Sequence, residues 1–119
     1  MRSLRRSAGS FRYALAGLRY LFTTQPNARI HLVAAFAAVG LGWMLRLTAV
    51  ELAILVLTIG FVLAAEAFNT AMEGIVDLMQ PSHHRVAGLA KDLSAAAVLV
   101  AAGTSVVVGA LLFVPRLMP

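Results

Sequence analysis

One twelve-residue stretch, EAFNTAMEGIVD at residues 66–77, concentrates the side chains that could do chemistry. Its polar and acidic residues recur at positions i, i+3, i+7 and i+11: Glu66, Asn69, Glu73 and Asp77. On an α-helix they fall at roughly 0°, −60°, −20° and +20°, which is one narrow stripe. Carboxylate and amide oxygens are the ligands that hard divalent cations prefer. The spacing therefore predicts a polar site on one helix face that binds a cation and accepts a proton.

A lysine and a further carboxylate, Lys91 and Asp92, follow this stripe after a short loop. In phosphoryl transfer a metal neutralises the phosphates, a lysine supports them, and a carboxylate takes a proton from the attacking hydroxyl. The sequence contains neither a GxxxxGK[ST] loop nor a kinase-type glycine loop, which excludes the known soluble nucleotide-binding folds. The pattern favours phosphoryl transfer by another kind of protein.

The composition is that of a membrane protein. Hydrophobic residues make up 61% of the chain and charged residues 13%, with a mean hydropathy of +0.86. So little charge could not cover the surface of a water-soluble particle of this size. The net charge of +5 comes mostly from arginines that flank apolar runs, which favours anionic lipid headgroups over nucleic acid. The absence of cysteine excludes disulfides, thiolate nucleophiles and cysteine-type zinc sites.

The elements that must position the stripe are helices, so we predict an all-α membrane protein with a single domain over residues 1–119. Three apolar stretches predict transmembrane helices at residues 28–47, 49–79 and 91–114. The second is longer than the hydrocarbon core, so its last turns should project into the interface. Over residues 3–24, apolar residues spaced by three and four predict an amphipathic helix that lies in the membrane surface.

Local signals set the expected boundaries and the orientation. Pro26 should open the first span, Pro81 should end the second, and Pro115 should close the third. Thr48 and Glu51 form a capping-box pattern, which gives Glu51 a structural role outside the membrane. Eight lysines and arginines lie on one side of the spans and two on the other, so we expect a cytoplasmic N-terminus and an external C-terminus. The many small residues in the spans indicate an oligomer.

Two motifs together resemble a known family. ExxNTAxExxxD at residues 66–77, followed by AKDxxAAAV at residues 90–98, looks like the bacterial diacylglycerol kinase and undecaprenol kinase family. The resemblance covers nearly the whole chain, including the surface helix, the three spans and the short loop between the motifs. It implies a small homotrimeric enzyme of the bacterial inner membrane that transfers the γ-phosphate of ATP, with Mg²⁺, to a lipid alcohol. Active sites shared between neighbouring subunits are implied as well.

The resemblance also implies roles for individual residues. Glu66 matches the catalytic base, and Asn69 matches an amide beside it that positions the hydroxyl or the γ-phosphate. Glu73 matches a metal-binding carboxylate. The family's second metal ligand is a glutamate, and the corresponding position here is Gln25, whose amide oxygen should bind Mg²⁺ more weakly. We also assign Arg29, together with Glu66, to the lipid substrate.

The remaining matched residues are assigned to the nucleotide: Arg6, Tyr13, Asp77, His83, His84, Lys91 and Asp92. Lys91 is expected to hold phosphate. For His83 and His84, an exposed polar loop is an equally good interpretation. His31 is expected to be a polar residue at a helix end rather than a ligand, and three scattered histidines do not predict a zinc site.

Three alternatives stay open at this point. The lipid alcohol is undecaprenol or diacylglycerol, with the segment PNARIH at residues 26–31 favouring undecaprenol. A small ion-coupled transporter would also bury a glutamate, but near the membrane midplane, whereas these acids cluster toward one face. A catalytically weakened family member is the third alternative, because Gln25 replaces a glutamate. For a kinase, we expect Glu66, Glu73 and Asp77 to share a cavity that reaches Lys91.

Overall fold

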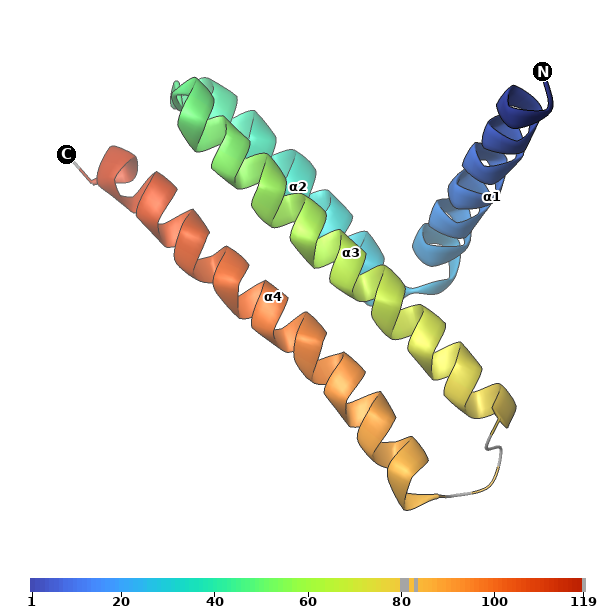
Figure 1. Ribbon diagram of the computed structural model, residues 1–119. Helices are drawn as coiled ribbons and strands as arrows, with labels where there is room; N and C mark the ends of the chain where they lie inside the picture. Colours follow the sequence, from blue (N-terminus) through green and yellow to red (C-terminus); the bar gives the residue numbers. More distant parts are fainter. Residues whose placement is uncertain (80–81, 83, 119) are drawn as a thin grey trace.

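The computed structural model describes residues 1–79, 82 and 84–118, and within these ranges it contains four helices and no strand. The helices are α1 (Arg2–Thr24), α2 (Pro26–Met44), α3 (Ala49–Met79) and α4 (Arg85–Leu117). Helices α2 and α3 form an antiparallel hairpin, α4 runs beside α3, and α1 leaves this bundle at a steep angle (Figure 1). The molecule is flat, with extents of 55 × 47 × 21 Å. The all-α prediction is confirmed.

Helix α1 keeps its apolar side uncovered over most of its length. Leu21, near its C-terminal end, is its only buried residue, whereas Leu4 and Phe11 are 73% and 66% exposed. The helix contacts both α2 and α3, through the part of α1 that is near its junction with α2 (Figure 1). An amphipathic helix with an uncovered apolar stripe has the form expected of one that lies in a membrane surface.

Helices α3 and α4, of 31 and 33 residues, are each long and apolar enough to cross a membrane. At a rise of ~1.5 Å per residue, α3 is about 46 Å long, well beyond a hydrocarbon core of roughly 30 Å. Among the described helices only these two satisfy the criteria of length and hydropathy. Helix α2 has 19 residues and carries Arg29 and His31 in its first turns, so a third crossing stays a prediction.

The predicted boundaries of the first two spans are close to the observed ones. Helix α2 begins at Pro26, two residues before the predicted start, and Gln25 is the extended residue that separates it from α1. It ends at Met44 instead of residue 47, because Arg46 adopts a φ of 57°, in the left-handed region where a helix cannot continue. Helix α3 has the predicted bounds. Pro81 lies outside the described residues.

Helix α4 is longer at both ends than the predicted span at residues 91–114. It starts at Arg85, where His84 Nδ1 accepts a hydrogen bond of 3.2 Å from the backbone N–H of Val86. The expectation that Pro115 closes the helix was wrong, because α4 continues to Leu117. Proline forfeits one backbone hydrogen bond, but the helix ends two residues later, where the Met118 N–H bonds to the Val114 carbonyl at 3.0 Å.

The tightest packing lies at the end of the bundle that holds the α2–α3 turn. Leu47, Leu55 and Leu112 are buried there among half-buried neighbours: Ala38, Leu52, Ile59, Val108 and Phe113. The capping box at the start of α3 is confirmed, because Thr48 and Glu51 exchange two hydrogen bonds of 3.2 Å between side chain and backbone. This end fixes the register of α3, and thereby the direction of the acidic stripe.

Candidate active site

Glu66 ends the buried face of α3. Leu55 and Val62 precede it on that face, and Glu66 is only 3% exposed. It is the one buried charged residue in the described part of the chain. Its Oε1 atom is fully buried without a hydrogen-bond partner. Since burying an unpaired carboxylate is costly, its retention at a packing position indicates a functional role.

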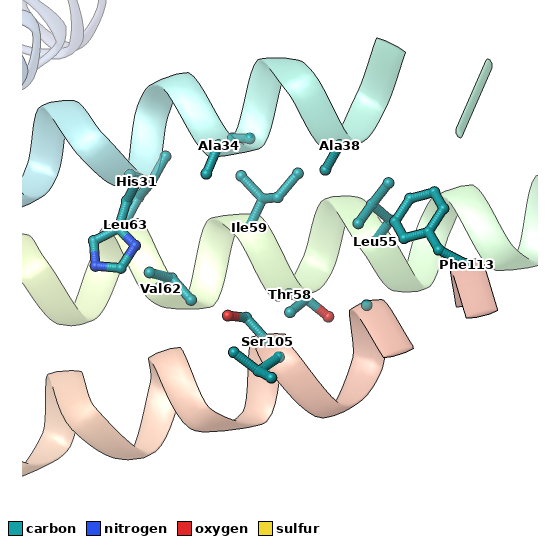
Figure 2. Close-up of a pocket in the computed structure, with 13 residues that line it drawn as sticks. His31, Ala34, Ala38, Leu55, Thr58, Ile59, Val62, Leu63, Ser105 and Phe113 are labelled. Carbon is teal, nitrogen blue, oxygen red and sulfur yellow. The ribbon is translucent and has the colours of Figure 1, made fainter. Parts of the chain in front are cut away.

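Helix α2 supplies the nearest basic group. His31 Nε2 lies 3.3 Å from Glu66 Oε1, although the two groups are not aligned for a hydrogen bond. His31 is 26% exposed and projects from α2 toward α3 beside Val62 and Leu63 (Figure 2). This contact was not predicted from the sequence. Residues 31 and 66 lie on different helices, so no spacing along one helix relates them.

Asn69, one turn after Glu66, faces α4. The Ser94 hydroxyl lies 2.8 Å from Asn69 Oδ1 and 2.9 Å from the backbone carbonyl of Lys91, so it donates to one of these two oxygens. Ser94 was not among the predicted site residues. Its position three residues after Lys91 on the same helix was the signal that could have found it.

The C-terminal end of the predicted stripe is joined to α4 by an ion pair. Lys91 Nζ lies 2.7 Å from Asp77 Oδ1, with side chains that are 39% and 65% exposed. An ion pair this open to solvent contributes little to stability. Its main effect is to hold the ammonium group of Lys91 beside the stripe.

The acidic stripe therefore borders two helices. Glu66 is directed to α2, whereas Asn69 and Asp77 contact α4. Glu73 lies between them, half-buried, with no hydrogen bond or ion pair to any other described residue. Within the described residues, Glu66 and Asp77 have separate partners, and neither of the two hollows beside the stripe is lined by both Glu66 and Lys91.

The other predicted site residues lie away from these contacts. The Gln25 amide donates to Thr24 Oγ1 at 3.3 Å, and His84 caps α4. The exposed members of the predicted set are Arg6, Tyr13, Arg29 and Asp92. His83 lies outside the described residues. The structure thus brings Ser94 and Lys91 of α4 to Asn69 and Asp77 of α3, and His31 of α2 to Glu66. No described hydrogen bond or ion pair joins the α1 residues to them.

Two hollows adjoin the stripe. A groove of about 630 Å³ separates α1 from α3, and its walls include Gly17, Leu21, Thr70 and Gly74. An apolar pocket of about 200 Å³ lies between α2, α3 and α4, with His31 at one end and Phe113 at the other (Figure 2). Thr58 and Ser105 are its hydroxyl-bearing residues, and small residues such as Ala34 and Ala38 leave it open.

The donor set fits Mg²⁺ only in combination with a nucleotide. In residues 1–79, 82 and 84–118, no group of three or more histidine, aspartate or glutamate side chains could hold a metal ion. Mg²⁺, however, is commonly held by one or two carboxylates together with substrate phosphates and water. The Glu73 carboxylate, with no partner in the described chain, suits that mode of binding.

Comparison with known proteins relates the whole arrangement to lipid kinases. Residues 12–113 match the model of the family described as prokaryotic diacylglycerol kinase. A diacylglycerol kinase of Synechocystis is 46% identical over 110 residues, covering 92% of this chain and 63% of that protein. An undecaprenol kinase of Bacillus subtilis is 39% identical over 114 residues, covering 96% of this chain and 93% of that one.

A more distant relative carries the same kind of name. The diacylglycerol kinase of Escherichia coli is 33% identical over 89 residues, covering 75% of this chain and 73% of that protein. The family match spans α2, α3 and nearly all of α4, and thereby includes every residue of the acidic stripe and Lys91. This chain belongs to the prokaryotic diacylglycerol kinase family, a family of membrane lipid kinases.

Proposed function

We propose that this protein transfers the γ-phosphate of ATP to the hydroxyl group of a membrane lipid, undecaprenol or diacylglycerol, at the cytoplasmic face of the bacterial cell membrane. Membership of the family supports this activity. The observation that carries it is the buried Glu66 carboxylate on a helix whose next turns present Asn69 and the Asp77–Lys91 pair. No observation favours an ion-coupled transporter.

Glu66 is the general base in this proposal. Its carboxylate takes the proton of the lipid hydroxyl while the hydroxyl oxygen forms a bond to the γ-phosphorus. The bond between that phosphorus and the bridging oxygen of ADP breaks, and ADP leaves. Asn69, held from α4 by Ser94, lies one turn away and positions the hydroxyl or the γ-phosphate. A site on a membrane-spanning helix lets the lipid reach the base without leaving the bilayer.

Lys91 binds the phosphates at the cytoplasmic end. Its contact with Asp77 is exposed, so an incoming triphosphate can compete for the ammonium group. The nucleotide thus reaches Lys91 from the aqueous side, whereas the lipid reaches Glu66 from the membrane side. Asp92, together with Arg6, Tyr13, His83 and His84, completes the proposed nucleotide site.

Glu73 and Gln25 are the proposed ligands of Mg²⁺. When bound, the ion neutralises charge on the β- and γ-phosphates. Gln25 offers a neutral amide oxygen where the family pattern has a carboxylate, so its contribution to affinity is smaller. Replacing Gln25 by glutamate should raise turnover at low Mg²⁺; no turnover in either form would favour a weakened family member.

We further propose three transmembrane helices, a cytoplasmic N-terminus and a homotrimer with sites completed by neighbouring subunits. Large apolar side chains are exposed along every helix, for example Phe36, Phe68 and Val106 at 70% or more. Such surfaces suit lipid or another copy of the chain. A site completed by a second copy also accounts for the separate partners of Glu66 and Asp77 within one chain.

The direct test is transfer of labelled phosphate from ATP to each lipid in mixed micelles. We expect labelled undecaprenyl phosphate, labelled phosphatidic acid, or both, and the ratio of kcat/KM values identifies the preferred alcohol. Background transfer to both lipids by folded protein, with ATP and Mg²⁺ present, would contradict the proposed activity.

A further inference from the structure

The buried and half-buried positions of α2 carry small residues and two leucines, Leu32 and Leu41, and His31 is the one polar residue among them. Ala28, Ala35, Ala38 and Gly42 recur at spacings of seven, three and four residues, and each is buried or half-buried. Small residues let two helices approach closely. His31 occupies the same face at the spacing of three from Ala28, so a bulky polar ring stands where the pattern otherwise has alanine or glycine.

The face of α3 that packs against α2 is also apolar except for one polar residue, Glu66. Leu55, Ile59 and Val62 form an apolar contact face, and Glu66 continues it at the next helical turn. The two polar exceptions meet, with His31 Nε2 at 3.3 Å from Glu66 Oε1. Within the described residues, His31 is the sole basic side chain within 4.0 Å of this carboxylate.

The two oxygens of Glu66 have different surroundings. Oε1 is fully buried without a hydrogen-bond partner, and it is the oxygen that His31 approaches. Oε2 is not among the fully buried, unpartnered atoms. The distance of 3.3 Å between Nε2 and Oε1 is within the range of a hydrogen bond, so only the alignment of the two groups is missing. That hydrogen bond would fix the carboxylate plane and leave Oε2 to face the substrate.

We propose that His31 is the positioning residue of the catalytic base: it donates from Nε2 to Glu66 Oε1 and thereby directs Oε2 toward the lipid hydroxyl. This inference rests on the proposed role of Glu66 as the base. Misplacing a reacting group by about 1 Å can cost on the order of 100-fold in rate. Loss of His31 should therefore act on the chemical step and not on nucleotide binding.

The test compares three single variants of the full-length protein in lipid micelles. His31→Leu removes the donor, His31→Gln restores an N–H donor of similar reach, and Thr58→Val is the control. Thr58 lines the same pocket as His31, but its hydroxyl bonds only to the carbonyl of Ile54 on its own helix, at 2.7 Å. Each variant is checked by thermal unfolding before kcat and KM for ATP are measured.

We expect His31→Leu to lower kcat by about 10- to 100-fold, with KM for ATP changed less than twofold. His31→Gln should recover most of the lost rate, and Thr58→Val should match the unmodified protein. Unchanged kcat in folded His31→Leu would overturn the inference, and so would a folded His31→Gln as slow as His31→Leu, since a role confined to packing predicts no rescue.

The combination of His31→Leu with Glu66→Gln separates this inference from the function on which it rests. If Glu66 is the base, the double variant should be no slower than Glu66→Gln alone, because no carboxylate is left to position. Substantial activity in Glu66→Gln would refute the role of Glu66 itself. An inactive Glu66→Gln together with a fully active His31→Leu would refute only the role of His31.

Discussion

The two ends of the α3 helix are held in different ways. At the α2–α3 turn, Glu51 accepts two hydrogen bonds from the Arg116 guanidinium, at 2.5 and 2.8 Å, and completes a capping box with Thr48. Toward the opposite end, Asp77 has one exposed contact with Lys91, and Glu66, near the middle of the helix, has a buried oxygen without a hydrogen-bond partner. The first end satisfies its charged groups within the chain, whereas the second leaves them available to ligands.

This contrast teaches that charge in the same helix has two distinct uses. A charge whose neighbours satisfy it stabilises the fold, and its loss should lower stability without affecting chemistry. A charged side chain that is buried without full pairing lowers the stability of the fold. Such side chains are therefore commonly found at functional sites. The following substitutions test that division between the two ends, beginning with the largest expected effect.

Glu66→Gln should abolish phosphate transfer, with a loss of at least 100-fold that general-base removal typically causes. Nucleotide binding should stay nearly intact, because the substitution removes the proposed base and leaves the proposed nucleotide-site residues Glu73 and Lys91. Thermal unfolding should occur at the same or a higher temperature, since an unpaired buried carboxylate disappears. Activity assays with parallel nucleotide-binding measurements check this. Retained activity with weakened Mg·ATP binding would show that Glu66 and Glu73 have each other's roles.

Glu73→Gln should weaken Mg·ATP binding by about tenfold while lowering kcat less, because it removes the proposed metal ligand and not the proposed base. Titrating turnover with Mg²⁺ at fixed ATP gives the result. Raised Mg²⁺ should restore part of the activity. A fall in kcat that no concentration of Mg²⁺ relieves would argue against a metal-binding role.

At the α2–α3 turn, Gly42→Ala should destabilise the protein relative to Gly40→Ala by about 1–3 kcal/mol, the usual cost of overpacking. A Cβ at Gly42 would lie 2.8 Å from Leu47 Cδ1, whereas one at Gly40 would meet nothing within 4 Å. Leu47 is itself buried, so it cannot move aside freely. Both substitutions replace glycine by alanine within α2, so the gain in helix propensity is the same in the two variants and does not contribute to the difference between them. Equal unfolding temperatures would contradict the tight packing of this turn.

Arg116→Gln should lower the unfolding temperature slightly, because it breaks a bidentate ion pair with Glu51. Phosphate transfer at a temperature where the variant is folded should be unchanged. Arg46→Gln, which removes a charge at the same end, is the control for net charge. A loss of kcat in Arg116→Gln without a loss of stability would break the proposed division between the two ends.

The sequence predicts most helix boundaries because local chemistry sets them. Pro26 can start a helix but not continue one from α1, and Thr48 with Glu51 closes a capping box that needs only four consecutive residues. The start of α4 was missed because the expected span was defined by hydropathy, whereas backbone hydrogen bonds continue through the polar turn that His84 caps. The prediction that Pro115 ends the helix was wrong, because the backbone hydrogen bond that a proline removes has little effect on stability close to a helix end.

In the candidate site, too, the residues that share one helix could be predicted from the sequence, whereas contacts between helices could not. Glu66, Asn69, Glu73 and Asp77 share one helix, so a periodicity of 3.6 residues is enough to group them. His31 and Ser94 reach them from other helices, and pairing between helices depends on their relative rotation, which one helix's periodicity does not contain. The contact between Glu51 and Arg116 was missed for the same reason.

In the proposed reaction, the stripe of α3 and Lys91 of α4 bind ATP, and its γ-phosphate is transferred to a membrane alcohol. A structure of the protein in lipid with Mg²⁺ and a non-hydrolysable ATP analogue tests it most directly. We predict the triphosphate against Lys91, a metal ion on Glu73, and the γ-phosphate directed toward Glu66. A nucleotide bound away from α3, with Glu66 still enclosed and distant from every phosphate, would contradict the account.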